Sequence, residues 1–109
     1  MNFNEYQIES RKTADYPNMG SNYVYPAFGL AGETGEVMEK LKKLQRDHND
    51  VLTDEYRDKI AGECSDVLWY LANLCTELGL TLEDIAQMNL KKLFDRKARG
   101  VIKGDGDNR

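Results

Sequence analysis

The feature that most constrains this fold is the helical spacing of apolar residues in two long stretches that contain no proline. The first stripe is formed by Leu30, Val37, Leu41 and Leu44, and the second by Ile60, Cys64, Val67, Leu71, Leu74 and Leu78. Spacings of this kind place side chains on one face of an α-helix. Pro17 and Pro26, the two prolines, both precede the first stripe. The pattern therefore predicts two long helices that pack through these faces.

Helix start and stop signals divide the remaining chain. Thr53 and Thr81 can each cap a helix N-terminus, and Gly79 and Gly100 suit helix ends. Pro26 fits the first turn of a helix, where its missing N–H costs little. No segment alternates apolar and polar residues as a strand does. The sequence predicts an all-α antiparallel bundle of about four helices. The predicted helices cover residues 4–16, 26–47, 54–78 and 82–99.

Length and charge narrow the functional classes. The 109 residues suit a single domain, residues 1–109. A net charge of −4 argues against a general nucleic-acid binder. No apolar run approaches the roughly 20 residues of a membrane span, and the N-terminus lacks the apolar core of a signal peptide. We therefore expect a cytoplasmic protein with no membrane or nucleic-acid partner.

An acidic pattern, Ala-Gly-Glu followed by two variable residues, an acid and Val, occurs twice, as AGETGEV and AGECSDV. It places Glu33 and Glu36 on one helix and Glu63 and Asp66 on the next, with each pair flanking an apolar stripe. Carboxylates at the edge of a core must be hydrated, paired or bound to a metal. Antiparallel helices would bring the two pairs together. An all-carboxylate set favours Mg²⁺, with Mn²⁺ as a substitute.

The acidic residues have other possible roles. A single E-x-x-E on a helix is usually a solvated face, but two copies with the same flanking residues on successive helices favour a metal site. A di-iron centre needs Glu-x-x-His motifs, and His48, the one histidine, follows Gln45 at that spacing. Gly32 and Gly62 inside helices each cost up to ~1 kcal/mol relative to alanine. That cost is tolerable where a backbone or a ligand must come close.

Basic residues gather in the last predicted helix, which contains NLKKLFDRKARG. Asn89, Lys92 and Arg96 share one face, where an amide, an ammonium and a guanidinium could hold a polyphosphate and a sugar hydroxyl. The alternative is that basic residues near a helix C-terminus complement its dipole and aid solubility. Tyr70 follows Asp66 by one turn and could reach a ligand bound there, with core packing as the alternative.

The run VLWYLANLC in the third predicted helix is apolar around most of its circumference. A helix of this kind is buried on several sides, and four short helices in one protomer cannot easily cover it. We therefore expect a homo-oligomer that assembles through its helices.

Three blocks, GLAGETGEVMEK, GECSDVLWYLA and NLKKLFDRKARG, resemble the MazG-like all-α nucleoside triphosphate pyrophosphohydrolases. That family is marked by E-x-x-E on one helix and E-x-x-D on the next. The resemblance implies a Mg²⁺-dependent enzyme that cleaves (deoxy)nucleoside triphosphates to the monophosphate and pyrophosphate, controlling or cleaning the nucleotide pool. It also implies dimers or tetramers, often with sites built at subunit interfaces.

The resemblance also assigns roles to residues. The acids that match metal-binding and catalytic positions are Glu33, Glu36, Glu63 and Asp66. The residues that match substrate-binding positions are Lys92 and Arg96 near the phosphates and Asn89 and Tyr70 near the sugar or base. Many members carry a second glutamate just before the first motif, where this chain has Gly32. Which acid orients the attacking water is therefore not decided by the resemblance, and Glu33 is a candidate.

The sequence leaves two questions open, the activity of the domain and the conformation of its tail. A catalytically silent helical module that binds nucleotide or a partner chain is the alternative to an enzyme. The tail, residues 101–109, is polar and rich in glycine, which predicts mobility. Similar endings in short family members instead fit a tail that folds over the site or braces a neighbouring subunit.

Overall fold

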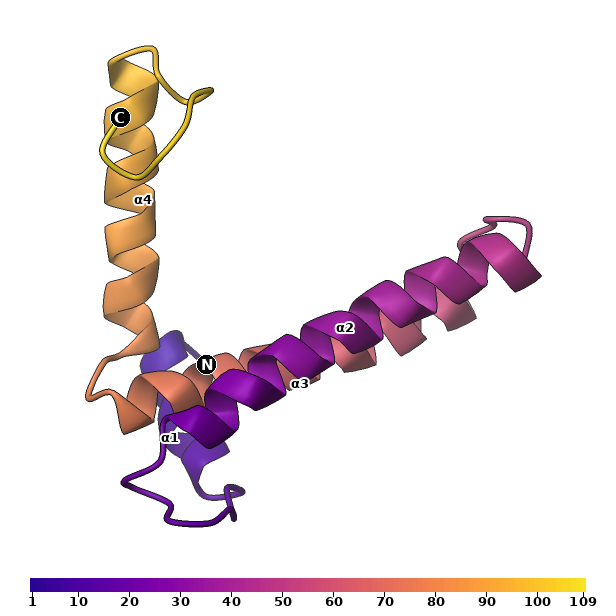
Figure 1. The fold of residues 1–109 in the computed structure, drawn as a ribbon, viewed down its shortest axis with the longest axis horizontal. Helices are drawn as coiled ribbons and strands as arrows, with labels where there is room; N and C mark the ends of the chain where they lie inside the picture. The colour runs from indigo at the N-terminus through magenta and orange to yellow at the C-terminus, as the bar shows by residue number, and fades with distance from the viewer.

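The chain folds into four α-helices without a strand, and the computed structural model describes all of residues 1–109 (Figure 1). The helices are α1 (Phe3–Arg11), α2 (Val24–Asp47), α3 (Asp54–Glu77) and α4 (Leu82–Ala98). α2 and α3 form an antiparallel hairpin, α1 packs against α3, and α4 extends away from one end of the hairpin. The predicted all-α class is confirmed. None of the helices combines the length and the apolar character that crossing a bilayer requires.

The predicted caps set the ends of α3 and α4. The side-chain oxygens of Thr53 and Thr81 each accept a hydrogen bond of 3.1 Å from the backbone N–H three residues later. Each bond satisfies an N–H that the first helical turn leaves without a partner. Gly79 and Gly100 follow the two helices with φ angles of +70° and +73°, a conformation that favours glycine. These cap predictions are confirmed.

α1 ends at Arg11, earlier than the predicted end at Tyr16. Tyr16 turns back toward α3, where its hydroxyl donates a hydrogen bond of 2.5 Å to Glu77 Oε1. The Glu77 side chain is 1% exposed and also accepts from the Gly20 N–H at 2.9 Å. Burial alone would raise the pKa of Glu77, but these hydrogen bonds hold it below its ordinary value. Tertiary bonds therefore override the helix propensity of the residues after Arg11.

One protomer buries little of itself. Only 11 of 109 residues are buried, and the buried apolar cluster consists of Ala72, Cys75 and Leu82, where α3 meets the first turn of α4. The radius of gyration is 16.9 Å, whereas a compact chain of this length has about 13 Å. The protomer is therefore an open structure with much uncovered apolar surface.

The two predicted apolar stripes are covered only in part. Leu44 is the one stripe residue that is buried, while Leu41, Cys64 and Leu78 are exposed. α4 also leaves large apolar side chains uncovered. These are Met88, Leu90, Leu93 and Phe94. The prediction that these stripes form the core thus holds only partly within a single protomer.

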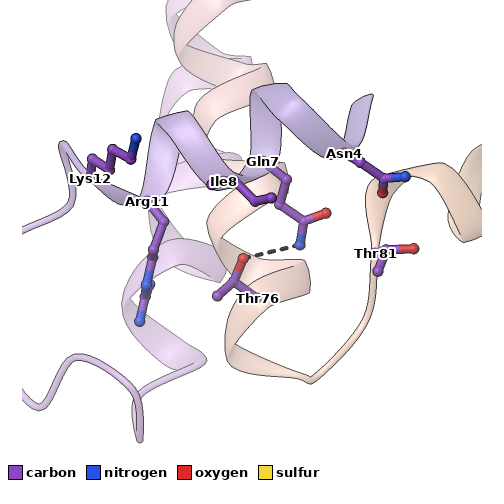
Figure 2. A pocket seen from close by; sticks show the side chains of 7 residues that line it. All are labelled: Asn4, Gln7, Ile8, Arg11, Lys12, Thr76 and Thr81. Atoms are coloured by element: carbon purple, nitrogen blue, oxygen red, sulfur yellow. Dashed lines mark hydrogen bonds between the residues drawn. The ribbon is translucent and has the colours of Figure 1, made fainter. Parts of the chain in front are cut away.

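Gln7 of α1 joins three helices at the point where α4 departs (Figure 2). Its side-chain N–H donates to Thr76 Oγ1 at 3.0 Å and to the Leu80 carbonyl oxygen at 2.9 Å. Its side-chain oxygen accepts from the Leu82 N–H at 2.8 Å. Because Gln7 and Leu82 are both buried, these bonds fix the direction of α4 without competition from water.

We expect Gln7→Leu to lower the free energy of unfolding by about 2–3 kcal/mol, because buried polar groups lose their partners. Chemical denaturation followed by circular dichroism measures this loss. Gln87→Leu is the matched control, since the Gln87 side chain bonds to Glu83 at the surface of α4, and its effect should stay within about 0.5 kcal/mol. Equal losses in the two variants would contradict the role assigned to Gln7.

Candidate functional site

Three of the four predicted acids converge on the α2–α3 hairpin. Glu33 of α2 and Glu63 and Asp66 of α3 each offer a carboxylate oxygen, and these oxygens lie within 4.8 Å of one another. Glu33 and Glu63 are half-buried, and Asp66 is exposed. The antiparallel packing of the helices therefore holds three like charges together.

The electrostatic effect of this group is clearest at Glu33. Burial raises the pKa of the Glu33 carboxyl, and the negative charges of Asp66, Glu63 and Glu36 raise it further. Lys40 makes the one ion pair of the group, with its Nζ 4.0 Å from Glu63 Oε1. Three carboxylates beside one cation at this distance are short of positive charge, which a divalent cation would supply.

Glu36 stands apart from the other three acids. It is exposed and lies outside the group whose oxygens fall within 4.8 Å of one another. Its charge still acts on Glu33, which lies one turn earlier on α2. The structure thus brings three predicted ligands together and leaves the fourth at the rim.

Tyr70 lies between the acidic group and a hollow with aromatic walls. Burial raises the pKa of the Tyr70 hydroxyl, with further contributions from Tyr25, Glu33 and Asp66. The hollow has a volume of about 480 Å³ and is lined by Asn22, Val24, Tyr25, Phe28, Gly29 and Tyr70. A Cβ at Gly29 would lie 2.1 Å from the Tyr70 ring, so only glycine lets this ring lie across α2. Tyr70 therefore lines the hollow on one side and lies near the acidic group on the other.

Sequence reasoning missed Tyr25, Phe28 and Gly29. The available signal was the aromatic stretch YVYPAFG directly before the first acidic motif. The glycines singled out from the sequence, Gly32 and Gly62, have no atom within 4 Å of a Cβ built on them. No backbone approaches these two glycines within the protomer, and the close approach occurs at Gly29.

α4 carries the predicted phosphate-binding residues away from the acids. Only the start of α4 packs against α1 and α3, and the rest extends from the hairpin (Figure 1). Asn89 is exposed and Lys92 is half-buried. Arg96 is buried, but by the tail of the chain, since its guanidinium donates to the Asp107 carboxylate. A single protomer therefore does not unite these residues with the acidic group.

The largest hollow lies elsewhere and contains none of the predicted site residues. It measures about 570 Å³ and lies between α1 and the turn from α3 to α4 (Figure 2). No acid lines it, and the polar atoms of Gln7 and Arg11 are engaged by Thr76, Asn73 and other groups of the protein itself. We therefore assign no ligand to this hollow.

Comparison with known proteins places this sequence in a family. The sequence pattern described as the MazG nucleotide pyrophosphohydrolase domain matches residues 27–101, which hold both acidic motifs and all of α4. The chain belongs to the MazG family. It is also 45% identical to the gene 37 protein of Mycobacterium phage L5, and the alignment covers the full length of both chains. No solved structure matches the chain.

The acidic group fits the divalent metal on which MazG proteins generally depend. Its donors are all carboxylate oxygens, which suit hard cations such as Mg²⁺ and Mn²⁺ better than zinc. Glu33, Glu63 and Asp66 each offer an oxygen that could bind such an ion.

We expect Glu33→Gln to raise the melting temperature in the presence of a chelator by about 2–4 °C, because it relieves repulsion among the three acids. The matched control is Glu36→Gln, which makes the same charge change outside the group and should shift the midpoint by less than about 1 °C. Thermal melting followed by circular dichroism gives both values. Equal shifts, or a lower midpoint for Glu33→Gln, would contradict the clustering.

Proposed function

We propose that this MazG-family chain hydrolyses (deoxy)nucleoside triphosphates to the monophosphate and pyrophosphate, with Mg²⁺ as cofactor and Mn²⁺ as a substitute. The observation that carries the proposal is the convergence of Glu33, Glu63 and Asp66 within 4.8 Å on helices that hold both family motifs. A carboxylate group of this kind suits a cation that is shared with substrate phosphates.

Each acid has a role in this proposal. Glu33, Glu63 and Asp66 hold the cation, and Glu36 at the rim is placed to join them. Bound Mg²⁺ supplies positive charge against the triphosphate and lowers the pKa of water. Glu33 is our candidate for the acid that orients the attacking water and accepts its proton.

Water, and not a side chain, is the proposed nucleophile. Phosphoryl transfer depends mainly on positioning and charge neutralisation. His48 caps the C-terminal end of α2 beside Tyr56, and Cys75 is buried in the core cluster. The exposed cysteine, Cys64, follows Glu63 and lies about two turns of α3 beyond Tyr56, so no histidine stands beside it to form a nucleophilic pair.

The aromatic hollow supports a nucleotide as the substrate. Tyr25 and Phe28 present exposed rings beside Tyr70, at 42% and 75% of their full exposure. A planar base can stack on such rings whatever its identity. Because Tyr70 borders both the hollow and the acids, a base held there would direct its phosphates toward the cation.

We further propose that a second copy of the chain completes each site, in a dimer or a tetramer. Asn89, Lys92 and Arg96 cannot meet the acids within one protomer, because α4 extends away from the hairpin. α4 also exposes large apolar side chains, among them Leu90, Leu93 and Phe94 on one face, and the hairpin leaves part of its stripes uncovered. Packing α4 of one copy along the hairpin of another would cover both surfaces and bring cations to carboxylates.

The remaining assignments are extensions of the same proposal. The net charge of −4 supports a small nucleotide as the ligand over a nucleic-acid polymer. A single domain over residues 1–109 and a cytoplasmic location stay predictions.

Pyrophosphate release from a panel of ribo- and deoxyribonucleoside triphosphates with Mg²⁺ tests the proposal. We expect Glu63→Gln to lower kcat/KM at least about 100-fold, because it removes a metal ligand. The control is Glu39→Gln, since Glu39 pairs with Lys42 and Lys43 on α2 and lies outside the acidic group.

Full activity of Glu63→Gln, or no pyrophosphate from any nucleotide, would contradict an enzyme. Nucleotide binding without hydrolysis would indicate the alternative, a silent binding module.

A further inference from the structure

The C-terminal tail, residues 101–109, folds back along the last turns of α4 (Figure 1). The Arg109 guanidinium holds it by donating to the carbonyl oxygens of Val101, at 3.1 Å, and of Gly106. Gly106 has a φ of +77°, and a Cβ on Gly104 would lie 2.7 Å from Arg109 Cδ. The tail is therefore a loop held against α4 by hydrogen bonds, and the left-handed φ at Gly106 favours glycine there.

This loop places one carboxylate on two cations of α4. Asp107 Oδ1 lies 3.1 Å from Arg96 Nη2 and 3.3 Å from Lys92 Nζ, and Arg96 also donates to the Asp107 carbonyl oxygen at 3.0 Å. These two cations hold the pKa of the Asp107 carboxyl below its ordinary value. The cations that the proposed function assigns to substrate phosphates thus already hold an anion from the chain itself.

We propose that Asp107 is an internal competitor for these cations and that the triphosphate of the substrate displaces it. The inference rests on the proposed function in assigning Lys92 and Arg96 to phosphate. A guanidinium binds carboxylate and phosphate through the same planar set of N–H donors, so a phosphate can take the place of a carboxylate. A triphosphate carries more negative charge than one carboxylate and is therefore the stronger ligand.

The burial of the two partners favours exchange over a permanent brace. The Asp107 side chain is 80% exposed, so water screens its ion pair and weakens it. The Arg96 side chain is only 5% exposed while the loop covers it, so the closed loop must supply the guanidinium with an anion, and Asp107 is that anion. The loop therefore stays closed until another anion replaces Asp107. It makes the α4 cations respond to polyphosphates more strongly than to anions of single charge.

The chain offers a matched control and a charge-neutral deletion. Asp105 lies in the same exposed loop, carries the same charge and takes no part in the bonds to Lys92 and Arg96. Ending the chain after Ile102 removes the loop together with two cationic and two anionic side chains, so the net charge is unchanged.

Binding of inorganic tripolyphosphate in a chelating buffer, measured by calorimetry, tests the proposal. We expect Asp107→Asn and the shortened chain to bind about threefold to fivefold more tightly than the wild type. Asp105→Asn should stay within about twofold of it. In the wild type, saturating tripolyphosphate should lower the heteronuclear NOE of the backbone amides in residues 103–108, because the released loop gains fast motion.

Equal or weaker binding by Asp107→Asn and the shortened chain would overturn the proposal and make the loop a brace for Arg96. An unchanged or higher heteronuclear NOE of the loop on binding, or no binding by any of these chains, would overturn it too. Since the measurement involves neither divalent metal nor hydrolysis, a chain that binds as expected but releases no pyrophosphate would contradict the proposed function alone.

Discussion

The candidate site depends on the antiparallel packing of α2 against α3, which holds three carboxylates within 4.8 Å of one another. Apolar side chains and the hydrogen bond from the Tyr56 hydroxyl to the Lys40 carbonyl oxygen, at 2.6 Å, hold the helices together. The acidic group opposes that packing, because burial and the neighbouring negative charges raise the pKa of the Glu33 carboxyl. The hairpin thus carries an electrostatic cost at one place, and a divalent cation bound there would remove it. Residues that stabilise the rest of the fold therefore make the acidic group tolerable.

The second constraint is the open shape of the protomer. Gln7 fixes α4 so that it points away from the hairpin, which separates Lys92 and Arg96 from the acids and leaves the apolar face of α4 exposed. The hairpin in turn leaves much of its predicted core uncovered. One arrangement, α4 of a second copy against the hairpin, would answer all of these observations. The tail then acts on the same cations from within each chain.

The range over which each interaction acts decides how much could be predicted from the sequence. Thr53 and Thr81 act within one turn, so the starts of α3 and α4 could be predicted. The helical phase of Glu33, Glu63 and Asp66 follows from their spacing, so their convergence needed only an antiparallel pair of helices.

The features that sequence reasoning missed depend on pairs of residues that no local pattern encodes. These pairs are Tyr16 with Glu77 at the end of α1, Gly29 with Tyr70 at the hollow, and Arg96 with Asp107 at the tail. Gly29 shows why such pairs cannot be predicted from local sequence. Its need for glycine comes from a ring on the neighbouring helix, whereas Gly32 and Gly62, with the same local setting, meet nothing.

The central claim is that the acids of one copy act together with the α4 cations of another. Refolding a mixture of Glu63→Gln and Lys92→Ala chains tests it most directly, because a mixed dimer contains one site in which both parts are intact. At equal mixing, we predict recovery of about a quarter of the wild-type rate of pyrophosphate release, although each variant alone is inactive. A mixture that assembles and exchanges subunits but recovers no activity would contradict the account.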